Sequence, residues 1–123
     1  MPRFMLFMYP VISDDEYRAG PSLEDVQTMS RYNEELVKAG AMLAGDGLDA
    51  EATRVTKQGV VDGPFSEAKE LVGGYWILQC KDREEALEWA KRVPLMGDSF
   101  VELRRIFEPE DFSEEIRAVA YQP

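Results

Sequence analysis

The chain has 123 residues, 45% of them hydrophobic and 31% charged, which is the size and composition of one domain with its own core. It carries 14 basic and 24 acidic residues, a formal net charge of -10, so it repels phosphate groups, and we expect neither nucleic acid nor a membrane surface as a partner. It has no histidine, which excludes a Ser-His-Asp triad, a Cys-His pair and a zinc site built on imidazole.

Targeting features are sparse. No apolar run approaches the roughly 20 residues that a membrane-spanning helix needs, and residues 1–4 lead straight into a strand-like segment without the apolar core of a signal peptide. The single cysteine, Cys80, cannot form an internal disulfide, and no basic residues are patterned around it to activate a thiolate. We therefore expect a cytoplasmic protein with an inert, buried thiol.

The sequence does not indicate a metal or cofactor site. Asp46, Asp49 and Glu51 form an acidic cluster, but their spacing does not fit a calcium-binding loop. We expect no metal ion and no bound cofactor.

In the first third of the chain, a strand and a helix are predicted. The dense apolar segment 4–9 is typical of a central strand that is covered on both faces. An acidic loop over residues 13–16 follows. Ser22 can cap a helix whose apolar residues recur at helical spacing until Gly40, which predicts a helix over residues 22–39.

The middle of the chain contains shorter strands. Residues 41–48 predict a second strand, interrupted by Gly45 and Gly47, which indicates a bulge or a close approach of another backbone. Residues 53–57 and 59–62 predict a small hairpin.

The last part completes the fold. Residues 71–80 are the strongest strand candidate, the capping box at Asp82 begins a helix that Pro94 ends, and residues 100–107 form a closing strand. This order predicts an α+β fold of the split βαβ, ferredoxin-like type, in which two helices cover one face of an antiparallel sheet.

Apolar side chains occupy both faces of the first, third and last predicted strands of the sheet, yet two helices cover only one face. A second copy of the chain can cover the other, so we expect a homodimer with a small-molecule pocket at the junction of the two sheets. The domain comprises residues 1–107, including the hairpin and loop of residues 53–70. The acidic tail, residues 108–123, belongs to the same unit and either folds over the partner or ends as a loosely ordered segment.

Several motifs occur in order along almost the whole chain. They are YNEELVKAG at 32–40, GDGL at 45–48, DGPFSEAKE at 62–70, GGYW at 73–76, EALEWA at 85–90 and FEPEDF at 107–112. Together they resemble the DGPF-type branch of the YCII-related family. The resemblance implies a dimeric α+β barrel of the ferredoxin-like type, and genes of this branch often lie beside genes for alternative sigma factors.

The resemblance does not identify a reaction for this chain. Some YCII-like relatives use a His-Asp general acid/base design, and their histidine aligns near Met29 of this chain. A thioether cannot shuttle a proton, so whether this chain is an enzyme stays open.

The Asp62-Gly63-Pro64 turn has two interpretations. It is a turn built by its own backbone preferences, or it walls the pocket and points Asp62 at a ligand. Glu67 and Lys69 share a face if the segment is extended. They are either solvated loop charges or a pair that binds a polar substrate or transfers a proton, which makes Asp62 and Glu67 the catalytic candidates.

Other candidates for ligand binding are aromatic or basic. Arg104 either pairs with Glu102 or another acid, or presents its planar guanidinium to an anionic substrate. Tyr32 and Trp76 are core residues by default, whereas Tyr9, at a strand end, can present its hydroxyl to a cleft.

Three functions are consistent with the sequence. The first is a cofactor-independent lyase or isomerase that uses Asp62 or Glu67 with Tyr9 or Arg104. The second is a small-molecule binding module that acts as a sensor, and the third is a dimer that binds a basic protein partner.

Overall fold

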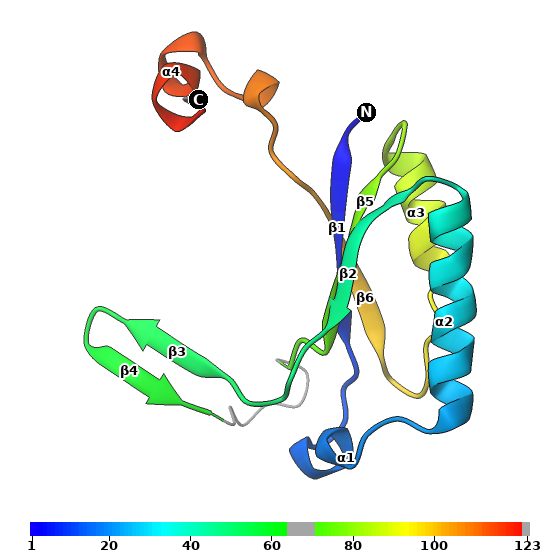
Figure 1. The fold of residues 1–123 in the computed structure, drawn as a ribbon. Helices are drawn as coiled ribbons and strands as arrows, with labels where there is room; N and C mark the ends of the chain where they lie inside the picture. The colour runs from blue at the N-terminus through cyan, green and yellow to red at the C-terminus, as the bar shows by residue number, and fades with distance from the viewer. Residues whose placement is uncertain (64–70, 122–123) are drawn as a thin grey trace.

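The computed structural model describes residues 1–63 and 71–121 and shows the predicted α+β fold (Figure 1). Four antiparallel strands form a sheet in the order β2-β5-β1-β6, and helices α2 and α3 lie on one face of it. The strands are β1 (Arg3–Tyr9), β2 (Met42–Gly47), β5 (Gly74–Gln79) and β6 (Phe100–Arg105), and the helices are α2 (Leu23–Lys38) and α3 (Arg83–Lys91). This is the ferredoxin-like arrangement that the order of elements predicts.

The core lies between the sheet and the two helices. Leu6 of β1 is opposite Trp76 of β5 on one side and Leu103 of β6 on the other. These side chains form an apolar row across the sheet, on the face that the helices cover. Leu36 of α2 and Trp89 of α3 pack onto this row. The helices therefore cover only the face to which Phe4, Leu6, Trp76, Leu78 and Leu103 belong.

Both predicted helix starts are confirmed. The Ser22 side chain accepts a hydrogen bond from the Asp25 amide at 3.1 Å, and the Asp82 side chain accepts one from the Glu85 amide at 2.9 Å. Such caps satisfy amide groups that have no partner inside the first turn. After α2, Gly40 has a φ of 70°, a conformation that glycine adopts at little cost.

Residues 13–16 are not a loop, contrary to the sequence prediction. They begin a short helix, α1 (Asp14–Ala19), which Ser13 caps by accepting a hydrogen bond from the Glu16 amide at 3.1 Å. Acidic side chains in a first turn are stabilised by the helix dipole, and this is the signal that the prediction missed. The Tyr17 hydroxyl then donates to the carbonyl oxygens of Gly73, at 2.9 Å, and of Leu48.

Two strands end or begin at least two residues away from the predicted bounds. Strand β5 begins at Gly74 rather than at residue 71, because the Gly73 carbonyl accepts hydrogen bonds from Tyr17 and from the Leu48 amide, at 2.9 Å, at the edge of the ladder. Strand β6 ends at Arg105 rather than at residue 107. Beyond it the chain leaves the sheet, and the Phe107 side chain is 65% exposed.

The glycines of β2 mark the irregularity that the sequence indicates. The register between β2 and β5 shifts between Met42 and Ala44. A β-carbon at Gly45 would lie 2.9 Å from Cδ1 of Trp76 and 2.6 Å from Cε of Met42. The strand therefore has both a bulge and a close approach to a side chain.

Two segments project from the domain. The hairpin consists of β3 (Thr53–Thr56) and β4 (Gly59–Asp62), and the tail contains the 3-10 helix η2 (Pro109–Asp111) and helix α4 (Glu114–Ala120). Both extend to the side of the sheet that faces away from α2 and α3, so the molecule has the outline of a C (Figure 1). In the described part of the chain, no helix combines the length and the apolar composition that crossing a membrane requires.

Candidate functional site

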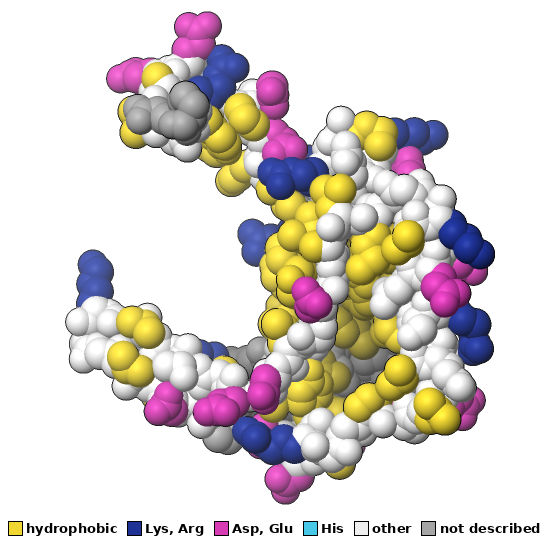
Figure 2. Space-filling model, viewed as in Figure 1, with side chains coloured by type: hydrophobic (Ala, Val, Ile, Leu, Met, Phe, Trp, Pro, Cys, Tyr) yellow, Lys and Arg dark blue, Asp and Glu magenta, His cyan; other side chains and the backbone are white. Residues whose placement is uncertain are grey.

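The sheet face opposite the helices is apolar over much of its area. We call it the open face and define it by the side chains of alternate strand residues that point away from the core. It consists of Met5, Phe7 and Tyr9 of β1, Ala44 and Asp46 of β2, Tyr75 and Ile77 of β5, and Phe100, Glu102 and Arg104 of β6. In Figure 2, hydrophobic side chains line the hollow between the hairpin and the tail, where this face lies.

An aromatic pair occupies one end of the open face. The rings of Tyr9 and Phe100, which are partners in the β1–β6 register, stack at 4.7 Å between centroids with an interplanar angle of 12°. Two residues later, Val11 has a φ of 54°, which is costly for a β-branched side chain. The chain thus turns sharply away from the sheet directly after Tyr9.

A tyrosine-carboxylate pair lies at the β2 edge of the face. The Tyr75 hydroxyl donates to Oδ2 of Asp46 at 3.1 Å, and this hydrogen bond, followed by the carboxylate charge, raises the pKa of Tyr75. By sequence alone, Asp46 belongs to an acidic cluster with Asp49 and Glu51, and nothing relates it to Tyr75. Only the β2–β5 register, which depends on the bulge, places the two residues side by side.

Arg104 and Glu102 are exposed on the same face, at alternate positions of β6. Within residues 1–63 and 71–121, neither side chain forms a hydrogen bond or an ion pair, so the predicted Arg104–Glu102 pairing is not made inside one chain. Arg105 points to the other side and donates to both carboxylate oxygens of Asp111, at 2.8 and 2.9 Å. Of these two arginines, Arg104 is therefore the one whose guanidinium group is available to bind an anion.

Tyr32 and Trp76 lie on the helix side of the sheet, away from Tyr9 and Arg104. The buried Tyr32 hydroxyl donates to the Trp89 carbonyl oxygen at 2.8 Å, and burial raises the pKa of Tyr32 far above its ordinary value. Nε1 of Trp76 donates to the Asn33 side chain at 2.8 Å. The polar atoms of both side chains are hydrogen-bonded, as is usual for aromatic residues in a protein core.

Asp62 is exposed at the end of β4, where its Oδ1 accepts a hydrogen bond from the Thr53 hydroxyl at 2.8 Å. This bond closes the base of the hairpin, and among the described residues Asp62 contacts neither Tyr9 nor Arg104 through a hydrogen bond or an ion pair. Glu67 and Lys69, with most of the DGPF motif, lie outside the described residues.

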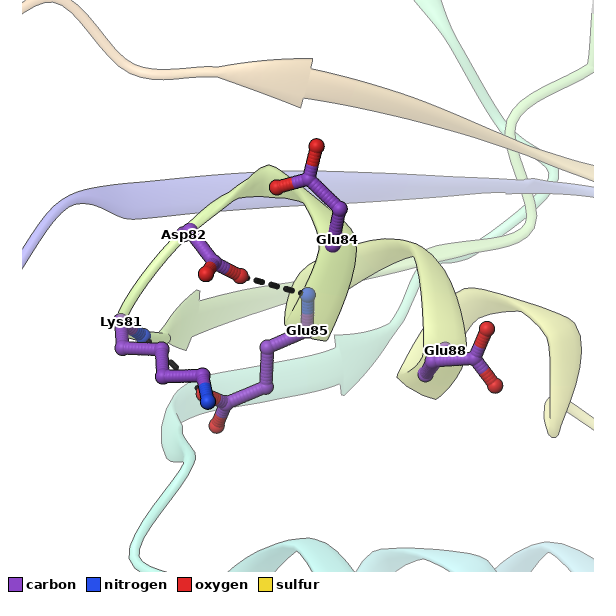
Figure 3. A pocket seen from close by; sticks show the side chains of 5 residues that line it. All are labelled: Lys81, Asp82, Glu84, Glu85 and Glu88. Atoms are coloured by element: carbon purple, nitrogen blue, oxygen red, sulfur yellow. Dashed lines mark hydrogen bonds between the residues drawn. The ribbon is translucent and has the colours of Figure 1, made fainter.

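A separate depression of about 370 Å³ lies at the start of α3 (Figure 3). Lys81, Asp82, Glu84, Glu85 and Glu88 line it. The Asp82 carboxylate caps the helix, and Oε2 of Glu85 accepts the Lys81 amide at 3.2 Å, so helix capping accounts for two of its carboxylates. No group of three or more cysteine or acidic residues in the described ranges is placed to hold a metal ion.

Comparisons with known proteins agree with the fold. No curated protein matches the chain. The family model of the YCII-related domain matches residues 4–110, which extend from β1 into η2 and include the hairpin and the open face. Because this match covers most of the sequence, the chain belongs to the YCII-related family.

Proposed function

We propose that the chain is a homodimeric small-molecule binding protein, in which two sheets pack through their open faces and the ligand occupies the cleft between them. The observation that supports this proposal is the exposure of apolar side chains on the open face. Phe7, Tyr9 and Ile77 are only half-buried and Phe100 is 40% exposed, on a sheet whose other face carries the buried core. Apolar surface of this extent is stabilised by a partner, and a two-fold dimer is the common solution for soluble proteins.

The polar groups of the open face favour an anionic ligand with an apolar body. Arg104 offers planar, bidentate donors that match a carboxylate. Around it, Met5, Phe7 and Ile77 supply apolar contact surface, and the Tyr9–Phe100 stack extends it. A small carboxylic acid is thus the ligand class that the face fits best.

We also propose that the chain belongs to the DGPF-type branch, on the basis of its motifs. A cytoplasmic location is proposed on the basis of the composition of the sequence. An enzymatic role has less support, because Asp62 is exposed and bonded to Thr53 at the base of the hairpin. An accessory role in binding another protein remains the outcome to consider if the cleft binds nothing.

Sedimentation velocity of the purified protein tests the dimer. We expect twice the mass of the chain for the wild type and a monomer for Phe100→Glu, which places a charge in the open face. Val26→Glu is the matched control, since Val26 is similarly exposed but lies on α2, on the opposite side of the sheet. A monomeric wild type at micromolar concentration contradicts the proposal.

Thermal stabilisation by a panel of small aliphatic and aromatic carboxylic acids tests the ligand class. A ligand at 100 times its Kd stabilises the folded state by about 2.7 kcal/mol, which is readily measured. We expect Arg104→Gln to remove the shift and Arg83→Gln, an exposed change on α3, to keep it. If no acid stabilises the dimer, the accessory role replaces ligand binding.

A further inference from the structure

The C-terminal arm, defined as residues 107–121, has an apolar side that no described part of its own domain covers. Phe112 contacts Phe107 and Tyr121, with ring centroids 5.3 and 6.0 Å apart. Next to them, Ile116 is 50% and Val119 is 77% exposed. The arm stands apart from the sheet and from α2 and α3 (Figure 1). Its seven-residue helix α4 is too short to be stable in water alone.

The direction in which the arm leaves the sheet is fixed. Arg3, at the start of β1, holds the Glu108 carboxylate with hydrogen bonds of 2.6 to 3.2 Å. Arg105, at the end of β6, holds Asp111 through two hydrogen bonds. The Asp111 carboxylate also accepts the Glu108 amide at 2.7 Å, which closes the turn at Pro109. These two ion pairs therefore fix the direction of the arm relative to the sheet.

The hairpin is a second uncovered element. All residues of β3 and β4 are exposed, among them the cross-strand pair Val55 and Val60. A two-stranded hairpin without a covered face is marginally stable at best in water. Hairpin and arm therefore both need a surface to pack against, and both extend on the side of the open face (Figure 1).

Hairpin and arm leave the sheet at opposite ends. The hairpin connects β2 and β5 at the end where Gly47 faces Gly74, whereas the arm follows β6 at the end where Arg105 faces Phe4. Two copies that pack face to face can be related by a two-fold axis parallel to the strands, which joins like ends. An axis across the strands instead joins the arm end of each copy to the hairpin end of the other.

Charge decides between these two arrangements. The arm carries Glu110, Glu114 and Glu115 against one basic residue, Arg117, in addition to the two carboxylates bound at its base, and like ends would bring two such acidic arms together. In the hairpin, residues 53–62, Lys57 offsets the single acid Asp62, so like charge does not oppose an arm that docks there. We propose that the C-terminal arm of each copy docks on the β3–β4 hairpin of a second copy, which buries the apolar side of α4 against the hairpin valines. This inference rests on the proposed dimer.

The test measures the dimer dissociation constant of four proteins by sedimentation at a series of concentrations. Val119→Asp in the arm and Val60→Lys in the hairpin are each expected to raise the constant roughly tenfold or more, because each dimer contains two arm-hairpin contacts. The matched control is Val37→Asp, since Val37 is 64% exposed and, like Val119, is the last but one residue of its helix. Val37 lies on α2, behind the sheet, and its change should leave the constant unaltered.

The double variant Val60→Lys/Val119→Asp identifies the pairing. If arm docks on hairpin, every contact of the double variant joins an aspartate to a lysine, and its dimer is tighter than that of either single variant. If arms meet arms, every contact joins like charges, and the double variant is weaker than both; this overturns the inference. A wild-type monomer overturns the proposed dimer as well, whereas a wild-type dimer that Val119→Asp leaves unchanged overturns the arm contact alone.

Discussion

Arg3 and Glu108, which are 105 positions apart in the sequence, form a bidentate ion pair: Nε of Arg3 lies 3.0 Å from Oε2 of Glu108, and Nη2 lies 2.6 Å from Oε1. The pair joins the first strand to the segment that follows the last one. Since Arg105 holds Asp111 in the same way three residues further on, the C-terminal arm has two attachments to the edge of the domain.

The first prediction concerns this attachment. Glu108→Gln removes the charge that Arg3 binds, so we expect the arm to become mobile while the free energy of unfolding of the domain changes little, because ion pairs open to solvent contribute little to it. Tryptic cleavage after Arg117, followed by mass spectrometry, should be several-fold faster than in the wild type. The control is Asp14→Asn, which breaks the exposed pair between Arg18 and Asp14 at α1. An unchanged cleavage rate in Glu108→Gln would show that the pair does not hold the arm.

The second prediction is a pH dependence of the same contacts. Hydrogen bonding by Arg3 lowers the pKa of Glu108 from its ordinary value of 4.5, and hydrogen bonding by Arg105 lowers the pKa of Asp111 from 3.8. For a carboxyl whose pKa is lowered in the folded state, the stabilisation is fully present above the ordinary pKa and is lost as the pH falls through the lowered one. The arm should therefore stay attached above pH 4.5 and loosen only as the pH falls below 3.8, the lower of the two ordinary values, towards the lowered pKa values.

Hydrogen exchange followed by mass spectrometry can measure this detachment, with rates corrected for the intrinsic effect of pH. The peptide that covers residues 107–121 should lose protection before peptides from α2 do. The variant Asp111→Asn, which cannot titrate at this position, should show a smaller change with pH. Simultaneous loss of protection in arm and domain would contradict the prediction.

The third prediction separates the core role of Tyr32 from a role in ligand binding. Tyr32→Phe removes the hydroxyl donor of the Trp89 carbonyl oxygen, which still accepts the Arg92 amide at 3.1 Å. Urea unfolding should therefore show a loss of about 0.5 to 1.5 kcal/mol, the usual net contribution of one hydrogen bond. Tyr9→Phe is the comparison, because Tyr9 stacks on Phe100 on the open face; its stability should change little. A carboxylic acid that stabilises the wild type should bind Tyr32→Phe with unchanged affinity.

The fourth prediction concerns Cys80, which has no exposed surface. Burial, together with the nearby carboxylates of Glu85 and Asp82, raises the pKa of the thiol from 9.0 to about 11. Because the folded pKa is raised, the stabilisation by the neutral thiol is fully present below pH 9 and is lost as the pH rises through about 11. The difference in unfolding free energy between the wild type and Cys80→Ala should shrink over this range. At pH 8, a thiol reagent should modify the protein only after unfolding.

The sequence predicted those parts of the fold that local patterns determine. The caps at Ser22 and Asp82 and the break at Gly45 each follow from neighbouring residues, and the order of elements was enough to predict the sheet. The site depends on the pairing of distant strands. Residue spacing does not reveal that Tyr75 meets Asp46, or that Trp76, one residue later, faces the helices. The sequence does show that Tyr9 lies at a strand end, but its stacking on Phe100 depends on the β1–β6 register.

The last prediction tests the close approach at Gly45, which follows directly after the register shift between Met42 and Ala44. At Gly45, a methyl group would lie 2.6 Å from the flexible end of Met42 and 2.9 Å from the ring of Trp76, which Asn33 holds in place through Nε1. Gly45→Ala should therefore cost about 1 to 3 kcal/mol, because the ring cannot move without breaking its hydrogen bond. Gly47→Ala, two residues further along β2, is the matched control. Among the described residues, its methyl group would meet the Gly73 carbonyl oxygen alone, at 3.9 Å, so its stability should stay within about 1 kcal/mol of the wild type. Equal effects of the two changes would show that Trp76 yields freely and that the close approach does not fix the register of β2.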